Sequence, residues 1–341
     1  MLFDKNNDFK STFIIAEIGV NHNGSVELAK KMIKSASECG VDAVKFQTFN
    51  SEDLVTKNAK TADYQAKNTN ENSQLIMLKK LELSFDNFKE LKEYALKNNI
   101  MFISSPFDIK SVDLLEKLDV PLYKIGSGEL TNFELIDYVQ KTDKPLIIST
   151  GMATLEEIKE SYDYIENKEN LIILHCITGY PTSFEEANLN FIKTLQKEFD
   201  VPIGFSDHSP GIELPIAAVA LGACVVEKHF TLDKNLEGPD HKASLNPIEF
   251  KAMVDAIRNV EVAMGDGVRK FSENEEEIKK VARKSIVLNQ DVKKGTVLQR
   301  EMLSIKRPGT GISPKNIDKI IGKIVISDLN ANSVLKWDDM E

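Results

Sequence analysis

Short apolar runs alternate with longer amphipathic segments between residue 13 and about residue 265. The runs are rich in β-branched residues and have the length of buried strands, about four to eight residues. They begin at residues 13, 43, 101, 122, 145, 171, 202 and 224, with the sequences FIIAE, AVKFQ, MFISS, LYKIG, PLIIS, LIILH, PIGFS and CVVEKHF. This alternation predicts a parallel sheet that is covered by helices.

The segments between the runs have helical periodicity. In residues 26–40, Leu28, Met32, Ile33 and Ala36 fall on one helix face and Gly40 supplies a stop. Eight such units over about 250 residues match the size of a closed (β/α)₈ TIM barrel, which is the fold class we predict. A doubly wound open sheet has the same alternation and is the alternative.

The sequence pattern changes after Gly265, where a charged stretch, SENEEEIKK, is followed by short apolar runs that are interrupted by Gly, Pro and Asn. We predict a barrel domain over 1–265, a linker over 266–283 and a compact, turn-rich domain over 284–341. A domain of about 60 residues is marginally stable alone, so we expect it to dock on its own barrel or on a neighbour's.

A long polar insertion, residues 50–80, follows the second predicted strand. Insertions of this length at a strand-to-helix junction usually serve a binding or catalytic site. We therefore expect this insertion to lie close to the functional residues.

Charge and cysteine content exclude several classes of protein. The net charge of -10 argues against a nucleic-acid-binding surface, which needs clustered Lys and Arg. Cys39, Cys176 and Cys224 are far apart and suit reduced thiols in a reducing compartment. The amino terminus, MLFDKNNDFK, is charged, and no later run reaches the about eighteen apolar residues of a membrane span. We expect a cytoplasmic protein without nucleic-acid or membrane partners.

Polar residues follow nearly every predicted strand. In a (β/α)₈ barrel the reacting groups project from the carboxyl ends of the strands. The polar residues at these ends are Glu17, Lys45, Gln47, Ser104, Ser105, Lys124, Ser149, Thr150, His175, Ser206, Asp207, His208, Glu227, Lys228 and His229, with Asp240 and His241 in the last loop.

All five histidines, His22, His175, His208, His229 and His241, are predicted to lie at or beyond strand ends, and none on a helix. A lone histidine is more often a hydrogen-bonded structural residue than a metal ligand. His208 and His229 follow two neighbouring strands, so their rings could converge on one divalent ion.

Two lysines lie inside apolar runs, where an unpaired ammonium group is strongly disfavoured. Lys45 and Lys124 therefore need an anionic partner. An internal acid, Glu17, Glu129 or Glu227, would make them structural, whereas a bound phosphate or carboxylate would make them functional.

Hydroxyl and acidic groups complete the candidate site. Ser127 in GSG, Ser149 in STG and Ser206 in GFSD offer hydroxyls, and the glycines let the backbone approach an anion closely. Glu129 and Asp240 could act as acid or base, or could simply pair with a lysine at the rim.

These residues lie within motifs that are similar to those of a known family. The motifs are AEIGVNHNG, VKFQTF, SSPFD, YKIGSGEL, ISTGMA, LHCITGYPT, GFSDHS, ALGACVVEKHFTLDK, GPDHKAS and KRPGTGISP. The chain resembles bacterial sialic acid synthases over essentially its whole length. The resemblance implies a TIM barrel followed by a small antifreeze-like (SAF, β-clip) domain, in a domain-swapped homodimer where that domain caps the partner's barrel.

The resemblance also implies roles for individual residues. His208 and His229 would hold Mn²⁺ or Mg²⁺. Phosphoenolpyruvate would be bound by Lys45, Lys124, Ser127, Ser149 and Ser206. An N-acylated mannosamine would be bound by Glu17, Gln47, Tyr180, Asp240 and Arg307, with Arg307 reaching across from the other subunit. Thr178 stands where some relatives carry an asparagine that helps to bind phosphate.

The implied reaction is a metal-dependent condensation of phosphoenolpyruvate with open-chain N-acetylmannosamine that gives N-acetylneuraminate and releases phosphate by C–O cleavage. Glu17, Glu129 and Asp240 are the candidate catalytic residues. The alternative activity is that of an N,N'-diacetyllegionaminate synthase acting on 2,4-diacetamido-2,4,6-trideoxymannose, and pseudaminate synthase is a further relative. From a different class, a non-catalytic sugar-binding protein or an ice-binding module would not need converging histidines, lysines and carboxylates.

Overall fold

The structure is a computed structural model that describes residues 11–341. The charged amino-terminal stretch, residues 1–10, lies outside the described residues. Among the residues that are described, no helix combines the length and the apolar character needed to cross a bilayer. The chain divides into two compact units, one ending at Gly265 and one from Asp266 to Glu341, and each is described by itself.

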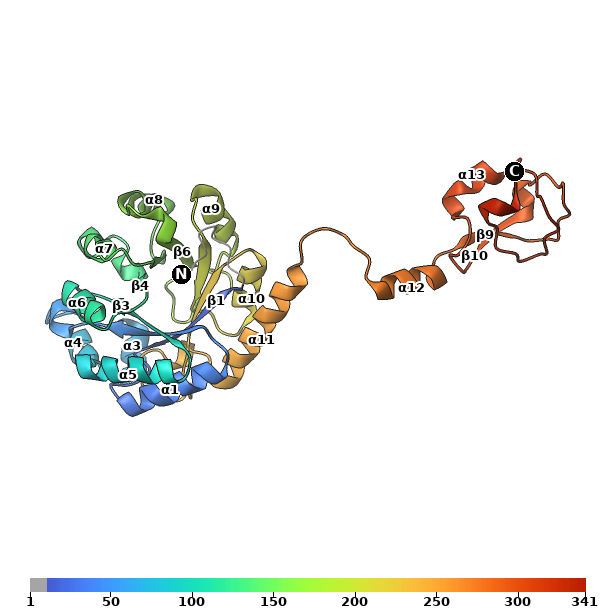
Figure 1. Ribbon diagram of the computed structural model, residues 1–341. Coiled ribbons are helices and arrows are strands. Elements are labelled where there is room, and N and C mark those ends of the chain that lie inside the picture. Colours follow the sequence, from blue (N-terminus) through green and yellow to red (C-terminus); the bar gives the residue numbers. More distant parts are fainter. Residues whose placement is uncertain (1–10) are drawn as a thin grey trace. The chain divides into compact units, whose positions relative to one another are not determined.

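Eight parallel strands form the first unit, and they close on themselves (Figure 1). The strands are β1 (Phe13–Gly19), β2 (Ala43–Thr48), β3 (Met101–Pro106), β4 (Tyr123–Ile125), β5 (Leu146–Ser149), β6 (Leu171–Cys176), β7 (Ile203–Asp207) and β8 (Val225–His229). β1 pairs with both β2 and β8, and β3 contacts β4, so the order of strands forms a ring. The predicted TIM barrel is confirmed, and the doubly wound open sheet is excluded.

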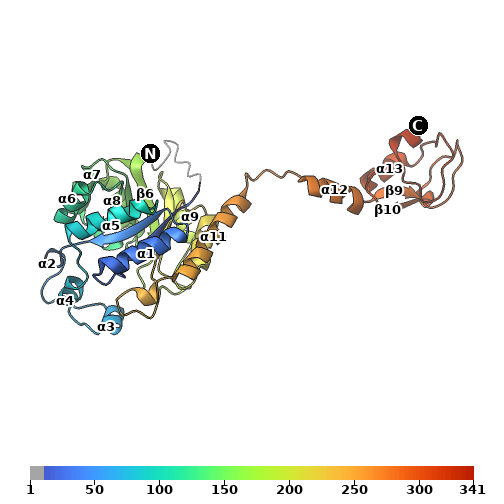
Figure 2. The same ribbon diagram turned by 60° about the horizontal axis from the view of Figure 1, so that its bottom comes forward.

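Helices surround the strands in both ribbon views (Figures 1 and 2). They are α1 (Val26–Glu38), α2 (Ser51–Leu54), α3 (Asp63–Thr69), α4 (Gln74–Lys79), α5 (Phe85–Lys97), α6 (Ile109–Lys117), α7 (Phe133–Gln140), α8 (Leu155–Tyr164), α9 (Asn190–Glu198), α10 (Glu213–Ala220) and α11 (Pro247–Met264). Short 3-10 turns lie at Ser127–Glu129, Lys168–Asn170 and His241–Ala243.

The hydrophobic core of the barrel has two layers. The inner layer is formed by strand residues that point into the barrel, such as Ile15, Ile103 and Ile172. The outer layer lies between strands and helices, where Met32 and Ile33 of α1 are completely buried, as the helical periodicity predicts. Because both faces of every strand are covered, the strands are apolar except near their carboxyl ends.

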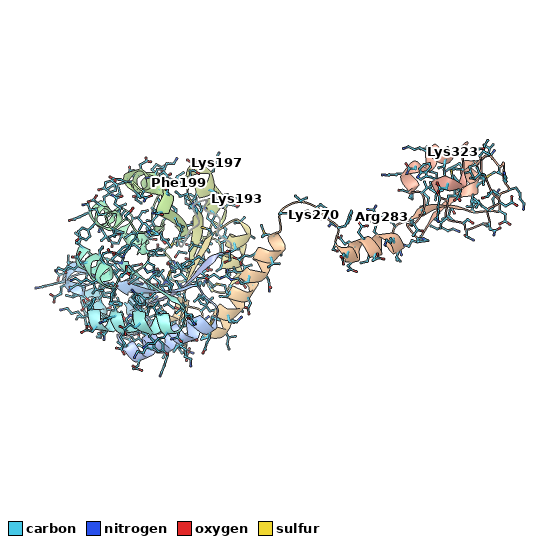
Figure 3. The ribbon with its side chains drawn as sticks, viewed as in Figure 1. Lys193, Lys197, Phe199, Lys270, Arg283 and Lys323 are labelled. Carbon is cyan, nitrogen blue, oxygen red and sulfur yellow. The ribbon has the colours of Figure 1, made fainter. Side chains whose placement is uncertain are left out.

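The helix α9 illustrates how the helices cover the barrel (Figure 3). Lys193 and Lys197, one turn apart, are exposed on its outer face, whereas Leu195 is buried against the strands. Phe199, at the end of the helix, is buried and lies 4.9 Å from the ring of Tyr162 of α8. Neighbouring helices therefore pack on one another as well as on the strands.

The polar insertion of residues 50–80 folds into the three short helices α2, α3 and α4, which lie together on one side of the barrel in Figure 2. Met77 and Leu78 of α4 are buried in a small cluster with Phe49 at the end of β2. The Asn68 amide donates a hydrogen bond to the Pro239 carbonyl, 2.9 Å away. The insertion is thus fixed to the loop that follows β8.

The second unit begins with α12 (Glu273–Ala282), which lies inside the predicted linker. A two-stranded antiparallel sheet follows, formed by β9 (Ser285–Leu288) and β10 (Leu303–Lys306), with the short helix α13 (Ile317–Ile320) and 3-10 turns at Arg300–Met302, Pro314–Asn316 and Trp337–Asp339. Its own small core includes Ile286, Leu298, Ile320 and Leu335, all completely buried.

Candidate active site

A cavity lined largely by polar and charged side chains lies at the carboxyl ends of the barrel strands and has a volume of about 150 Å³. Most residues that the sequence singles out line it: Glu17, Lys45, Gln47, Lys124, Ser127, Ser149, Thr178, Tyr180, Ser206, His208 and His229. With Ser105 of β3, the cavity is lined by side chains from all eight strands or the loops that follow them.

Two lysines and two glutamates form a charged network in this cavity. The Lys45 ammonium lies 2.7 Å from a Glu17 carboxylate oxygen and 3.8 Å from Glu227, and it donates to the Ser105 hydroxyl. The Lys124 ammonium lies 3.8 Å from the same Glu227 oxygen and donates to the Ile125 carbonyl at 3.2 Å. Internal acids therefore balance part of the lysine charge.

Burial acts differently on the two lysines. It opposes the charge of both ammonium groups, but the two nearby glutamates outweigh it at Lys45 and raise the pKa of that lysine. At Lys124 burial, reinforced by the charge of Lys45, prevails over the attraction of Glu227 and lowers the pKa. Lys124 is thus the less well balanced of the two, and an added anion would stabilise its charged form.

Hydroxyl groups and glycines line the wall beside Lys124. The Ser149 hydroxyl is buried without a hydrogen-bond partner, and a β-carbon added at Gly126 or Gly128 would meet no atom within 4 Å. A β-carbon at Gly151 would instead lie 2.1 Å from the Thr178 hydroxyl, so only glycine fits there. These features leave room for an anion to contact both hydroxyls and backbone amides.

The two imidazoles predicted to bind a metal lie next to each other. The ring centroids of His208 and His229 are 5.4 Å apart. His208 Nδ1 is 2.8 Å from the Ile177 carbonyl, whereas His229 Nδ1 is buried without a hydrogen-bond partner. An Asp240 oxygen lies 3.8 Å from His229 Nδ1, and the other Asp240 oxygen also has no hydrogen-bond partner.

These donors fit a divalent cation, because imidazole nitrogens and a carboxylate are accepted ligands of Mn²⁺ and Mg²⁺. Across residues 11–341, no group of three or more His, Cys, Asp or Glu side chains is already arranged around a common metal position.

Burial, followed by the charge of His208, lowers the pKa of His229 well below its usual value and keeps that ring neutral. Burial also opposes protonation of His208, but the Cys176 sulfur outweighs it and raises the pKa of His208 to about 9.

Two tyrosines cover the imidazoles. The Tyr180 ring lies 4.2 Å from the His208 ring and 5.6 Å from the His229 ring, measured between centroids. Tyr64, from α3 of the insertion, stacks on Tyr180 at 5.2 Å with an angle of 17° between the rings. The insertion therefore contributes an aromatic layer next to the cavity.

Three of the predicted site residues are not among those lining the cavity. Asp240 lies beside His229, and burial raises its pKa to about 7, with a further contribution from Glu17. Glu129 accepts a hydrogen bond from the Asn132 amide at 2.7 Å. Arg307 belongs to the second unit, where its side chain is exposed and donates to the Ala282 carbonyl at 3.0 Å.

The other three histidines have structural partners. His22 Nδ1 accepts a hydrogen bond from the Gly24 amide, His175 Nε2 pairs with the Ala187 carbonyl, and His241 Nδ1 pairs with the Thr231 hydroxyl. The expectation that no histidine lies on a helix is wrong for His241, which begins a 3-10 turn.

Phe107, Met152 and Cys176 also line the cavity, and the sequence analysis does not single them out. Cys176 ends β6 and lies 3.9 Å from His208 Nδ1. Side chains alternate between the two faces of a strand, so His175 and Cys176 cannot both face the cavity. His175 packs between Phe191 and Phe205, and Cys176 faces the opposite side, toward the cavity. Met152 has a left-handed backbone (φ 63°), a signal that is present only in the folded chain.

Known proteins share this architecture and sequence. Residues 32–269 match the NeuB family, and residues 283–341 match the SAF domain. Over 96% of its length the chain is 46% identical to the N,N'-diacetyllegionaminic acid synthase of Campylobacter jejuni and 45% identical to that of Legionella pneumophila, covering 99% and 94% of those proteins. The crystal structure of an N-acetylneuraminic acid synthetase from Leptospira borgpetersenii superposes with a TM-score of 0.71 and 35% identity, over 79% of this chain and 90% of that one. The resemblance seen in the motifs is therefore confirmed: the chain is an enzyme and belongs to the NeuB family.

Proposed function

We propose that this protein joins phosphoenolpyruvate to the open-chain aldehyde of 2,4-diacetamido-2,4,6-trideoxymannose, giving N,N'-diacetyllegionaminate and phosphate. The observation that carries the reaction type is one cavity in which two buried lysines lie beside two adjacent imidazoles. The lysines suit a small dianion, and the imidazoles suit a divalent cation. The combination suits a metal-assisted reaction of phosphoenolpyruvate.

Lys45 and Lys124 bind the carboxylate and phosphate of phosphoenolpyruvate in this proposal, with Ser127, Ser149 and Ser206 as hydroxyl donors. The poor charge balance of Lys124 and the unpartnered Ser149 hydroxyl support this assignment. Arriving negative charge would give both groups the partners that they lack. Thr178 lies at the position of the asparagine of some relatives and offers a hydroxyl to the same phosphate.

The sugar binds on the side of Glu17, Gln47 and Tyr180, with His208 and His229 at its aldehyde end. When bound, a divalent cation, Mn²⁺ or Mg²⁺, supplies Lewis-acid polarisation of an aldehyde oxygen. A bond forms between the terminal carbon of phosphoenolpyruvate and the aldehyde carbon. Water adds to the neighbouring carbon, whose bond to the phosphate oxygen then breaks as the added hydroxyl loses its proton to the departing phosphate and becomes the keto group.

This reaction needs one proton at the former aldehyde oxygen and removes one from the water. We assign one of these transfers to Asp240, because its carboxylate lies beside His229 and has an oxygen without a hydrogen-bond partner. Glu129, which lies outside the cavity lining and pairs with Asn132, is the less favoured candidate.

The choice of sugar rests on the relatives rather than on the cavity. The sequence analysis expects N-acetylmannosamine first, but the two synthases that are 45–46% identical are named for N,N'-diacetyllegionaminic acid. N-acetylmannosamine remains the second candidate, because the Leptospira structure with 35% identity is named for N-acetylneuraminic acid. We also infer a homodimer in which residues 266–283 act as the linker and the SAF domain of each subunit caps the partner's barrel.

Purified full-length protein is incubated with phosphoenolpyruvate, Mn²⁺ and each sugar in turn, and phosphate release and product mass are measured. The proposal predicts release with the diacetamido sugar, a smaller rate with N-acetylmannosamine, and no release after chelation of the metal. Faster turnover of N-acetylmannosamine would reverse the assignment of the sugar. Release that is independent of both sugars, or of the metal, would contradict the proposed reaction.

A further inference from the structure

A buried ion pair lies directly behind the two imidazoles and outside the cavity. Asp207 and Lys228 are 2% and 0% exposed, and they face each other in the register of β7 and β8. The Lys228 ammonium contacts the Asp207 carboxylate and donates to the Ser209 carbonyl. Each member of the pair immediately precedes one of the imidazoles, His208 and His229.

Ser209 completes the connection. Its backbone N–H donates to one oxygen of Asp207 at 2.9 Å, and its hydroxyl donates to the other at 3.0 Å. His208 therefore lies between two residues that are both bonded to Lys228. The chain on either side of His208 is fixed to the strand that carries His229.

The pair makes no contact with the reactants that we propose. Ser206 and Glu227, the preceding residues, line the cavity, so alternation along the strands points Asp207 and Lys228 to the opposite side. A buried ion pair is also not the most stabilising choice, because apolar residues of similar volume are often equally or more stable. Fold stability alone therefore does not explain why these two positions carry charges. A role in fixing the geometry at the ends of β7 and β8 would explain them.

We propose that Asp207, Lys228 and Ser209 form a positioning clamp that sets the distance and orientation of His208 and His229 for a shared divalent cation. This inference rests on the proposed metal site but concerns residues that touch neither cation nor substrate. Removing a residue that supports a metal ligand without touching the metal typically weakens metal binding by about 10- to 100-fold.

The test measures Mn²⁺ affinity directly, by electron paramagnetic resonance titration of the full-length protein without substrates. Asp207→Leu combined with Lys228→Met removes both charges together and leaves no unpaired buried ion. We expect this double variant to keep the far-ultraviolet circular dichroism spectrum of the wild type and to bind Mn²⁺ about 10- to 100-fold more weakly. Ser209→Ala, which removes one donor to Asp207, is expected to weaken binding by a smaller factor, about 3-fold.

The matched control is Arg258→Met, which breaks the ion pair of Arg258 with Asp42 near the start of the barrel strands. It is expected to lower thermal stability and leave Mn²⁺ affinity unchanged. Equal loss of affinity in this control would overturn the clamp, because general loosening of the barrel would explain the result. If the double variant does not fold, Ser209→Ala decides, and wild-type affinity there overturns the clamp.

The proposed metal site is checked separately with His208→Gln. Wild-type Mn²⁺ binding that is lost in this variant establishes the site. Wild-type protein that binds no Mn²⁺, or binding that His208→Gln does not change, would overturn the metal site and this inference with it. Binding that requires His208 but is unaltered in the double variant and in Ser209→Ala would overturn the clamp alone.

Discussion

Lys124 has one carboxylate partner in the cavity, whereas Lys45 has two. Replacing Lys124 should therefore affect the binding of phosphoenolpyruvate more than the stability of the fold. Replacement with Met removes a buried charge but keeps most of the side-chain volume. We expect the KM for phosphoenolpyruvate to rise about 10- to 100-fold, because a hydrogen bond to a charged group contributes about 1.5–3 kcal/mol. Thermal stability should stay equal or increase, since burial already disfavours this ammonium group.

Steady-state kinetics at varied phosphoenolpyruvate and a thermal melt measure the two effects of Lys124→Met. Lys144→Met is the control, because Lys144 pairs with Glu116 outside the cavity. An unchanged KM together with a large loss of stability would assign Lys124 a structural role.

We expect His22 to make the stability of the barrel depend on pH. It is 1% exposed and stacks on Phe46, and burial lowers its pKa to about 4. The unfolded chain, with a histidine pKa near 6.5, binds a proton that the folded chain does not, so stability falls as the pH drops from about 6.5 to about 4. At pH 5 the expected loss from this residue is about 2 kcal/mol relative to pH 7.

Urea unfolding at pH 7 and pH 5 tests this prediction, with His22→Asn expected to lose about 2 kcal/mol less than the wild type. Far-ultraviolet circular dichroism is the suitable probe, because the single tryptophan, Trp337, lies in the second unit and would not report on the barrel. Equal losses in both proteins would show that His22 is not the group that titrates.

The position of most cavity residues could be predicted from single polar residues at the ends of apolar runs, because barrel geometry brings those ends together. Tyr64 could not be predicted in this way. It lies in a polar insertion without a strand to fix its direction, and only its stacking on Tyr180 places it beside the cavity. Cys176 follows His175 at the end of an apolar run, and alternation along β6 places the thiol rather than the imidazole on the cavity side.

Among the elements, the insertion of residues 50–80 differs most from a simple barrel. Its helix α3 carries Tyr64, which stacks on Tyr180 of the cavity wall, and α3 is also bonded to the loop after β8 through Asn68. We expect Tyr64→Ala to raise the KM for the sugar about 2- to 10-fold, because an aromatic pair contributes about 0.5–1.5 kcal/mol and holds Tyr180 in place. The KM for phosphoenolpyruvate should be unchanged.

Tyr64→Phe keeps the aromatic ring and is the matched control, so near-normal sugar kinetics are expected. Loss of activity in Tyr64→Phe as large as in Tyr64→Ala would indicate that the hydroxyl, rather than the stacking, is required. An equal change in the KM of both substrates would contradict a role confined to the sugar.

The strands of the barrel could be predicted because each is a short, continuously apolar run, and the helices between them because most are amphipathic. The short helices α2, α3 and α4 were not predicted, because each has only four to seven residues, too few for a helical period to show. The charged stretch that was expected to be a linker contains α12, and its capping box of Ser272 and Glu275 was a usable sequence signal for a helix start.

In the whole molecule, the two units must cooperate if the proposed capping is correct. We expect Arg307→Ala to raise the KM for the sugar and to leave the KM for phosphoenolpyruvate nearly intact, because Arg307 would contact only the acylamino group. Steady-state kinetics with each substrate varied in turn measure this, with Lys306→Ala as the control, since Lys306 is equally exposed and bonds to Asn332. Equal loss for both substrates would contradict the capping role.

The pairing of β1 with β8 joins two segments that are separated by roughly two hundred positions in the chain. A ribosome-bound polypeptide that lacks β8 leaves the open edges of β1 and β7 without partners, and it also lacks Glu227 and His229. The closed barrel and the complete cavity therefore both require that β8 has been synthesised. A prematurely terminated product that lacks β8 would be prone to edge-to-edge association and would be inactive.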